Sequence, residues 1–417
     1  MTFKKISMQI RPILAALGRH KMATALIVLQ VALTLAVASN ALFIAATRVM
    51  HLSRPSGTDE AHIFVIRNDW KNGQTPVQID ANIRTDIADL RKVPGVRDAF
   101  SSEAFPLEGG GGVLSRLKLR PDQTTRPKLS IIYFTDEHAI DTFGISLVEG
   151  RNFRRDEIAA LGRYDKISAP VVIVTRSLAN KLFPDGSALG KTVYFADGPA
   201  AIIGIADALQ GPYAGSTTRS IDEDNVLFPA RFDDTDGTVY IVRTTSTDMA
   251  PVIKAALGAL SKREDVRLID PADGVVTLPQ ARERGYATDR SVASLMALAA
   301  GLLLLATAGG IVGLSSFWVS QRRRQIGIRR SLGATAADVL HYFHVENFLI
   351  VSGGIVLGSL LAFLANLALM NFYELPRLPL SAFMWGPLLL WLLGQAAVHG
   401  PARYAAKVPP IVAIRTE

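Results

Sequence analysis

The segment with the most suggestive chemical pattern is Gly186-Ser-Ala-Leu-Gly190-Lys191-Thr192. It is similar to the glycine-rich loop of ATPases, whose backbone amides surround a phosphate while a lysine neutralises its charge. That loop needs four residues between its glycines, whereas this segment has three, so its amides would not close around a phosphate in the usual way. We therefore interpret the segment as a turn that enters a β-strand. Any ATP hydrolysis that drives this protein is expected to occur in another chain.

Other residue types that carry chemistry are not arranged in a catalytic or metal-binding pattern. The seven histidines are scattered; His341 and His344 lie three positions apart, but no acidic cluster accompanies them beyond Glu346. No Gly-x-Ser-x-Gly turn or other nucleophile motif is present. The absence of cysteine excludes disulfides and thiolate metal sites. We therefore expect a non-catalytic protein that binds no metal or cofactor of its own.

Apolar residues are unevenly distributed along the 417-residue chain, of which 49% is hydrophobic. Four stretches are long and almost free of charge, and about 20 such residues in a helix cross a hydrocarbon core of about 30 Å. A cleavable signal peptide is the alternative for the first stretch, but its apolar run is longer than a signal core and follows a long basic leader. We therefore expect four transmembrane helices, at residues 23–46, 292–319, 343–370 and 380–398.

Lysine and arginine residues flank these spans asymmetrically. The leader, the segment between the second and third spans, and the C-terminal segment are all basic, whereas the short connection between the third and fourth spans has only Arg377 opposed by Glu374. Because basic segments stay on the cytoplasmic side, both termini are expected in the cytoplasm of a bacterial inner-membrane protein. The net charge of +8 therefore reflects membrane topology, and no nucleic-acid partner is expected.

The basic leader has a helical pattern of its own. Apolar residues recur at helical spacing between its lysines and arginines, at Ile6, Ile10, Ile13, Leu14 and Leu17. This pattern predicts an amphipathic helix that lies on the lipid of the inner leaflet before the first span. A flexible basic leader is the alternative.

Residues 50–290 are typical of a soluble domain outside the cytoplasm. Helical patterns are expected at 81–91, 177–182, 249–261 and from Leu278 onward, the last running continuously through Arg290 into the second span. These helices alternate with short β-type runs, which predicts a large α+β domain of two lobes. The expected strands are 62–67, 113–119, 130–134, 171–174, 192–195, 201–205, 225–228 and 238–242.

Within the spans, one charged residue and two glycine patterns stand out. Glu346 lies near the start of the third span, where an ionisable residue is either functional, paired with an arginine, or close enough to the headgroups to reach water. Small residues four positions apart let helix backbones approach closely. We therefore expect tight packing at Gly309 and Gly313 in the second span and at Gly354 and Gly358 in the third.

The segment between the second and third spans reads Ser320-Gln-Arg-Arg-Arg-Gln325-Ile-Gly-Ile-Arg-Arg330-Ser-Leu-Gly-Ala334. Membrane anchoring would explain the arginines alone. It does not explain why Ile326, Ile328 and Leu332 interrupt them and why Gly327 and Gly333 punctuate the run. This pattern favours a short helix that docks on a partner protein.

These residues resemble the R-R-R-E-I-G-I-x-R-A-L-G-A signature of FtsX-like permeases, the type found in MacB and lipoprotein-release transporters. Glu346, the glycine-rich run from Ser352 to Gly358, and the closing segment from Pro401 to Glu417 are also similar to that family. In the outer domain, residues 143–153 and 177–184 resemble MacB-type periplasmic sequence. The resemblance extends over nearly the whole chain.

The resemblance implies an ABC transporter permease that carries no fused ATPase domain and works by mechanotransmission. Its domains would be residues 1–49, with the amphipathic helix and first span; 50–287, a MacB-like periplasmic domain; and 288–417, an FtsX-like domain whose coupling loop is 320–342. Its partners would be a dimer of cytoplasmic ABC ATPases, which bind ATP and Mg, and a second permease, identical or not. The resemblance leaves open whether a periplasmic adaptor takes part. The coupling helix would comprise Arg323, Arg324, Gln325, Ile326, Gly327, Ile328, Arg330, Leu332 and Gly333.

One position departs from the family pattern, since Gln325 stands where the family usually has glutamate. Loss of that charge would weaken an ion pair with the ATPase, so that coupling would depend on the neighbouring arginines and isoleucines or on a non-identical second permease. We expect export or extraction of an amphipathic substrate, such as a peptide, an antibiotic or a lipid-linked molecule. The alternative is an FtsX-like transmembrane regulator that controls a periplasmic enzyme.

Overall fold

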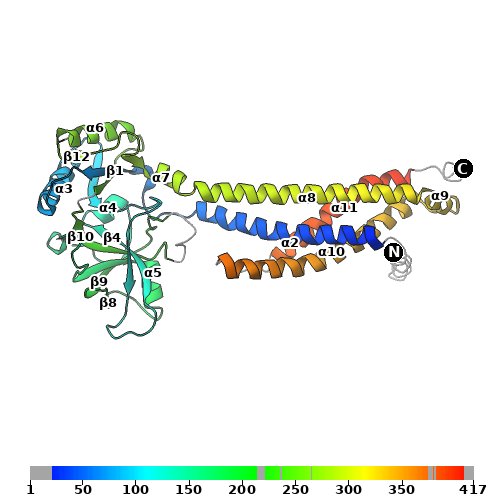
Figure 1. Cartoon of the computed structure of the whole chain (residues 1–417), viewed down its shortest axis with the longest axis horizontal. Coiled ribbons are helices and arrows are strands. Elements are labelled where there is room, and N and C mark those ends of the chain that lie inside the picture. The colour runs from blue at the N-terminus through cyan, green and yellow to red at the C-terminus, as the bar shows by residue number, and fades with distance from the viewer. Residues whose placement is uncertain are drawn as a thin grey trace. The chain divides into compact units, whose positions relative to one another are not determined.

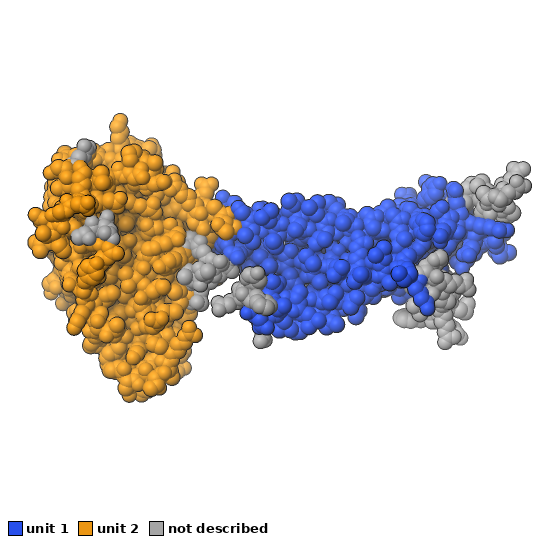
Figure 2. Space-filling model, viewed as in Figure 1, with its two compact units in different colours: residues 1–52, 289–417 blue, residues 53–288 orange. Residues whose placement is uncertain are grey.

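The computed structural model describes residues 21–213, 221–234, 237–263, 265–373, 379 and 382–407. The predicted leader helix before Lys21, the connection with Glu374 and Arg377, and the closing segment after Lys407 lie outside the described residues. The chain divides into two compact units (Figure 2). We call residues 1–52 with 289–417 the helical unit, and residues 53–288 the sheet unit.

Five helices make up the described part of the helical unit (Figure 1): α2 (Lys21–Leu52), α8 (Ala287–Gln321), α9 (Arg323–Ser331), α10 (Ala336–Tyr373) and α11 (Ala382–Ala406). Among the described residues, α2, α8 and α10 are long and apolar enough to cross a membrane. The fourth expected span coincides with α11, which contains Pro387 and Pro401 and does not meet the same measure of length and hydropathy. The count of four spans therefore stays a prediction.

An apolar core holds the long helices together. Its most buried members come from every one of them: Ile27, Val31 and Leu35 from α2, Ile311 and Trp318 from α8, Ile350, Val351 and Ile355 from α10, and Leu390 from α11. Each long helix therefore has one face inside the unit, while its other faces carry large exposed apolar side chains, chiefly leucine. This distribution is typical of helices whose outer faces contact lipid.

The first sheet of the sheet unit is antiparallel throughout and has the order β12-β1-β11-β2, with β13 beside β1. Helices α3 (Pro76–Leu90) and α6 (Ala250–Leu260) pack on it through Ile79, Ile83 and Val252. Thr75 forms a capping box with Gln78 at the start of α3, and Pro76 occupies the first turn. The strands are β1 (Ile63–Trp70), β2 (Val96–Ser102), β11 (Gly237–Thr244), β12 (Arg267–Leu268) and β13 (Val275–Thr277).

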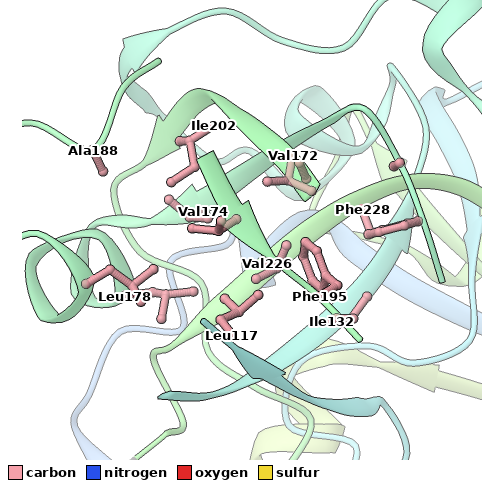
Figure 3. Close-up of a cluster of buried hydrophobic side chains, with 14 of the residues drawn as sticks. Leu117, Ile132, Val172, Val174, Leu178, Ala188, Phe195, Ile202, Val226 and Phe228 are labelled. Carbon is pink, nitrogen blue, oxygen red and sulfur yellow. The ribbon is translucent and has the colours of Figure 1, made fainter. Parts of the chain in front are cut away.

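The second sheet is mixed and has the order β3-β4-β10-β7-β9-β5, with β6 beside β10 and β8 beside β9. Its core, shown in Figure 3, joins Val172, Val174 and Ile202 of the central strands to Leu178 of α5 (Arg176–Leu182). The strands are β3 (Val113–Leu117), β4 (Lys128–Thr135), β5 (Leu147–Gly150), β6 (Ala159–Leu161), β7 (Val171–Thr175), β8 (Thr192–Tyr194), β9 (Pro199–Ala206) and β10 (Asn225–Phe232). Short helices complete the unit: α4 (Ala139–Phe143), α7 (Leu278–Gly285), and the 3-10 turns η1 (Glu60–His62), η2 (Arg155–Glu157) and η3 (Ser261–Arg263).

All eight predicted strands are present, and the glycine-rich segment that ends at Thr192 is a turn into β8, as predicted. The prediction of a continuous helix from Leu278 into the second span is wrong, because α7 ends at Gly285 and α8 begins at Ala287. Tyr286 separates them, with φ −97° and ψ 7°. Its ring is buried, and its hydroxyl accepts a hydrogen bond from Gln210. A buried and hydrogen-bonded side chain therefore lies at the break between the two helices.

Candidate functional site

The basic segment singled out in the sequence forms α9, a short helix whose C-terminal end is fixed by local hydrogen bonds. At its C-terminus Gly333 adopts φ +97°, Gly333 N donates to Arg330 O at 3.2 Å, and Ala334 N donates to Arg329 O at 3.0 Å. This is a Schellman end, which favours glycine at the left-handed position. Thr335 then caps α10, since its hydroxyl accepts from Asp338 N at 3.2 Å. Within the predicted coupling loop, the C-terminal end of α9 and the start of α10 are therefore both capped by local hydrogen bonds.

One face of α9 is part of the chain's own core. Ile326 is only 7% exposed and packs in a cluster with Val319 of α8, Phe343 of α10 and Ala402 of α11. Gly327 is also buried. Because Ile326 points inward, its predicted role as a surface contact for a partner needs revision. In this structure Ile326 anchors α9 to the C-terminal ends of α8 and α11 and to the N-terminal part of α10.

Glu346 is paired with Arg322, the residue that precedes α9. Nη1 of Arg322 lies 2.9 Å from Oε1 and 3.1 Å from Oε2 of Glu346. The Glu346 side chain is 2% exposed, and the guanidinium also lies 5.8 Å from the centre of the Trp318 ring. Of the roles that the sequence allows for Glu346, the structure therefore favours pairing with an arginine. The pair ties the junction of α8 and α9 to α10.

Three further arginines of this segment are held by the chain itself. Arg330 Nη1 donates to the backbone oxygen of Ala406 at 2.9 Å, near the end of α11. Arg329 lies over the ring of Tyr342, 5.3 Å from its centre, and Arg323 lies over Tyr404 at 5.7 Å. The arginine pattern alone did not reveal these partners. Only the partner Tyr404 had a signal in the sequence, because it lies within the family-like closing segment from Pro401 to Glu417.

The opposite face of α9 is exposed. Arg324 and Gln325 are exposed, as are Ile328 at 46% and Leu332 at 83%. Two large apolar side chains thus stand in a basic surface, while the other face of the helix is fixed in the core. This arrangement suits contact with another protein better than contact with water alone. We call Arg324, Gln325, Ile328 and Leu332 the outer face of α9.

The two glycine patterns in the long helices have different surroundings. A Cβ atom on Gly354 would lie 2.7 Å from Val31 Cβ, and one on Gly358 would lie 2.8 Å from Ala32 O. These two glycines therefore allow α10 to approach the backbone of α2 closely. Around Gly309 and Gly313 no other described atom lies within 4 Å of such a Cβ. Tight packing at that pair is therefore not seen within the described part of this chain.

Two family models together cover most of the chain. Residues 24–260 match the MacB-like periplasmic core domain, more than half of the sequence, and residues 297–410 match the FtsX-like permease C-terminal region. The chain belongs to the FtsX-like permeases with a MacB-like periplasmic domain. These matches confirm the resemblance to FtsX-like permeases that was first seen in the segment from Ser320 to Ala334. Members of this family are inner-membrane ABC permeases, and the sheet unit is the periplasmic part.

Relatives of this permease differ in length. It is 28% identical over 284 residues to a protein of Paracoccus denitrificans named macrolide export ATP-binding/permease protein MacB 1/2, covering 67% of this chain and 41% of that one. The chain spans about half the length of the curated MacB relatives it matches. It is 24% identical over 298 residues to the uncharacterized ABC transporter permease YvrN of Bacillus subtilis, covering 69% of this chain and 70% of YvrN.

Among solved structures, the periplasmic region of MacB from Actinobacillus actinomycetemcomitans matches 56% of this permease and 97% of that chain, at 15% identity and a TM-score of 0.33.

Proposed function

We propose that this permease is the membrane subunit of an ABC transporter and that a separate cytoplasmic ATPase docks on the outer face of α9. The observation that carries the proposal is the two-sided character of this helix. Ile328 and Leu332 are exposed among basic residues, whereas Ile326 is fixed in the core. A partner that binds one face would therefore move the helices attached to the other.

The contacts of α9 supply a route for that motion. The Arg322–Glu346 pair joins α9 to α10, and Arg330 joins it to the end of α11. A displacement of α9 is therefore transmitted to several long helices together, because the groups that connect them are buried or hydrogen-bonded. In this proposal α8, which follows the periplasmic unit in the sequence, carries the motion towards it.

The remaining parts of the proposal concern topology and cargo. Four spans would place both termini in the cytoplasm, since the basic segments flank the same ends of the helices. A second permease would complete the assembly, with the open glycine face of α8 at Gly309 and Gly313 available for helix packing. Relatives named for macrolide export support an amphipathic cargo. The chain itself would bind no nucleotide.

The experiment is to co-express the permease with a candidate ATPase and to measure its retention on the tagged permease and its ATP hydrolysis. The double variant Ile328→Asp/Leu332→Asp should lose both, because charge replaces the apolar contacts. Lys407→Asp is the matched control, since it adds negative charge at an exposed position outside α9. Gln325→Glu, which introduces the family's usual residue, should retain or strengthen binding.

Two results would contradict the proposal. One is full ATPase retention and stimulation by the double variant, which would place the docking surface elsewhere. The other is a complex of permease and ATPase that hydrolyses ATP and moves no cargo, but increases the activity of a periplasmic enzyme. That result would favour the transmembrane regulator.

A further inference from the structure

A second feature of the helical unit is a hollow of about 400 Å³ between the last turns of α8 and of α11. It is lined by Val312, Ser316 and Ser320 of α8, by Arg323, and by Gly400 and Tyr404 of α11. Gly400 lines the hollow, and among the described residues no atom lies within 4 Å of the place where its Cβ would be. A larger residue here would fill the space without a clash.

The hollow contains a cation that the described chain does not neutralise. Arg323 lies over the ring of Tyr404, and its Nη2 donates to the Tyr404 hydroxyl at 3.2 Å. No carboxylate in the described part of the chain forms an ion pair with Arg323, and Glu346 is bound by Arg322. Tyr404 thus holds the guanidinium in one place without cancelling its charge, so a bound anion would find it preorganised.

Two hydroxyl groups accompany this cation. Ser316 and Ser320 are four residues apart on α8, hence on the same face of the helix, and both line the hollow. Neither makes a side-chain hydrogen bond with another described residue. Two free donors and one fixed guanidinium suit an oxyanion with several acceptor oxygens, above all a phosphate.

The level of the hollow along α8 decides what kind of phosphate it suits. From Val292 to Gln321 the helix carries no charged residue, and the arginines begin immediately after it. This change marks the boundary between hydrocarbon and headgroups. On the hydrocarbon side of that boundary Val312 lines the hollow. Val312 is exposed, as is Phe317 on the same helix. A ligand with a phosphate at Arg323 and an apolar chain beside Val312 is a phospholipid.

We infer that the hollow between α8 and α11 is a binding site for one anionic phospholipid, with its phosphate on Arg323, Ser316 and Ser320. Charge favours an anionic over a zwitterionic lipid, because Arg324, Arg403 and Lys407 are further exposed cations on the same segments. The bound lipid would bridge α8 and α11. The inference requires α8 to lie in the bilayer, and it does not rest on the proposed ATPase or on any cargo.

The test is native mass spectrometry of the purified full chain in micelles, titrated with phosphatidylglycerol or phosphatidylcholine of identical acyl chains. We expect one phosphatidylglycerol to bind at least five-fold more tightly than phosphatidylcholine. Gly400→Leu, which fills the hollow, and Arg323→Gln, which removes the cation, should each weaken phosphatidylglycerol binding five-fold or more. Gly301→Leu is the matched control, since it is a glycine of α8 with an equally open surrounding that does not line the hollow.

Folding of each variant is checked by its thermal melting curve, because leucine is a better helix former than glycine and Gly400→Leu should fold. Equal affinity for the two lipids, or undiminished binding to Gly400→Leu, would overturn the inference. Displacement of the lipid by free glycerol phosphate at similar concentration would also overturn it, since the site would then bind soluble phosphates. Dimers that bind no phosphatidylglycerol would show that a second copy covers the hollow instead.

Discussion

Arg322 contacts both carboxylate oxygens of Glu346 through a single nitrogen, at 2.9 and 3.1 Å; the Glu346 side chain is 2% exposed and that of Arg322 is 12% exposed. Arg322 lies between α8 and α9, and Glu346 lies in α10. The pair therefore links the junction of α8 and α9 to α10. Such a pair contributes little over an apolar replacement of both residues, but it is costly to break by removing one of them.

Glu346→Leu should therefore destabilise the helical unit by about 3–5 kcal/mol, since the Arg322 charge stays buried without its partner. Arg322→Met/Glu346→Leu should recover much of that loss. Thermal unfolding in detergent measures both, with Arg324→Met, at an exposed position, as the control. A double variant that is as unstable as the sum of its single variants would show that the two residues do not act as a pair.

The contact between α10 and α2 gives a second prediction. Gly358→Val places side-chain atoms against Ala32, where even a Cβ would lie 2.8 Å from the carbonyl oxygen. The helices must separate, which should cost about 1–3 kcal/mol as in other overpacked cores. Gly313→Val on α8 is the control, because its surroundings in the described chain are open. Equal melting temperatures of the two variants would contradict the packing at Gly358; a loss of dimer in Gly313→Val alone would identify that face as the contact with a second permease.

The two sides of α9 should respond differently to truncation. Ile326→Ala removes a buried side chain from the cluster with Val319 and Phe343, and a loss of about 2–4 kcal/mol is typical of such changes. Leu332→Ala changes an exposed residue and should alter stability by less than about 0.5 kcal/mol. Thermal melting of the ATPase-free permease checks both. A large fall in Leu332→Ala would mean that this residue also packs within the permease.

The long helices of the helical unit were well predicted from the sequence because their physical signal is strong: a long run without charge is rarely compatible with anything but a helix in lipid. The strands with continuous apolar character, such as Val171–Thr175, were equally clear. The strands that were missed are short or polar. Val96–Ser102 reads Val-Arg-Asp-Ala-Phe-Ser-Ser and forms β2 because it pairs with β11, a contact distant in sequence that no local pattern shows.

The candidate site was predictable in position but not in orientation. Ile326 and Ile328 are two residues apart, so on a helix they point to different sides, yet only the surrounding helix ends decide which side is buried. The same limit applies to Glu346, whose partner Arg322 lies 24 positions away. Gly309 and Gly313 match the same small-residue pattern as Gly354 and Gly358, but only the latter pair meets a neighbouring helix in the described chain.

A last prediction concerns pH and Glu103, which follows β2 and contacts the other sheet. Its Oε2 accepts hydrogen bonds from Phe134 N and Ser102 Oγ, each at 3.1 Å, while Oε1 is out of contact with solvent and has no hydrogen-bond partner in the described chain. Burial raises the pKa of Glu103 to about 8, from an ordinary value of 4.5. The folded protein therefore binds this proton more tightly than the unfolded chain does.

The sign of the effect follows from proton linkage. A carboxyl group with a raised pKa stabilises the fold fully below its unfolded pKa of 4.5, and that stability is lost as pH rises towards about 8. Between these values the free energy of unfolding should fall by up to about 1.4 kcal/mol per pH unit. Glu103→Gln stays neutral and keeps an acceptor for Phe134 N, so it should flatten this slope and raise the melting temperature at pH 8.5 above that of the unmodified protein. Melting curves recorded from pH 5.5 to 8.5 decide the matter: parallel slopes for Glu103→Gln and the unmodified protein would show that Glu103 is ionised throughout this range.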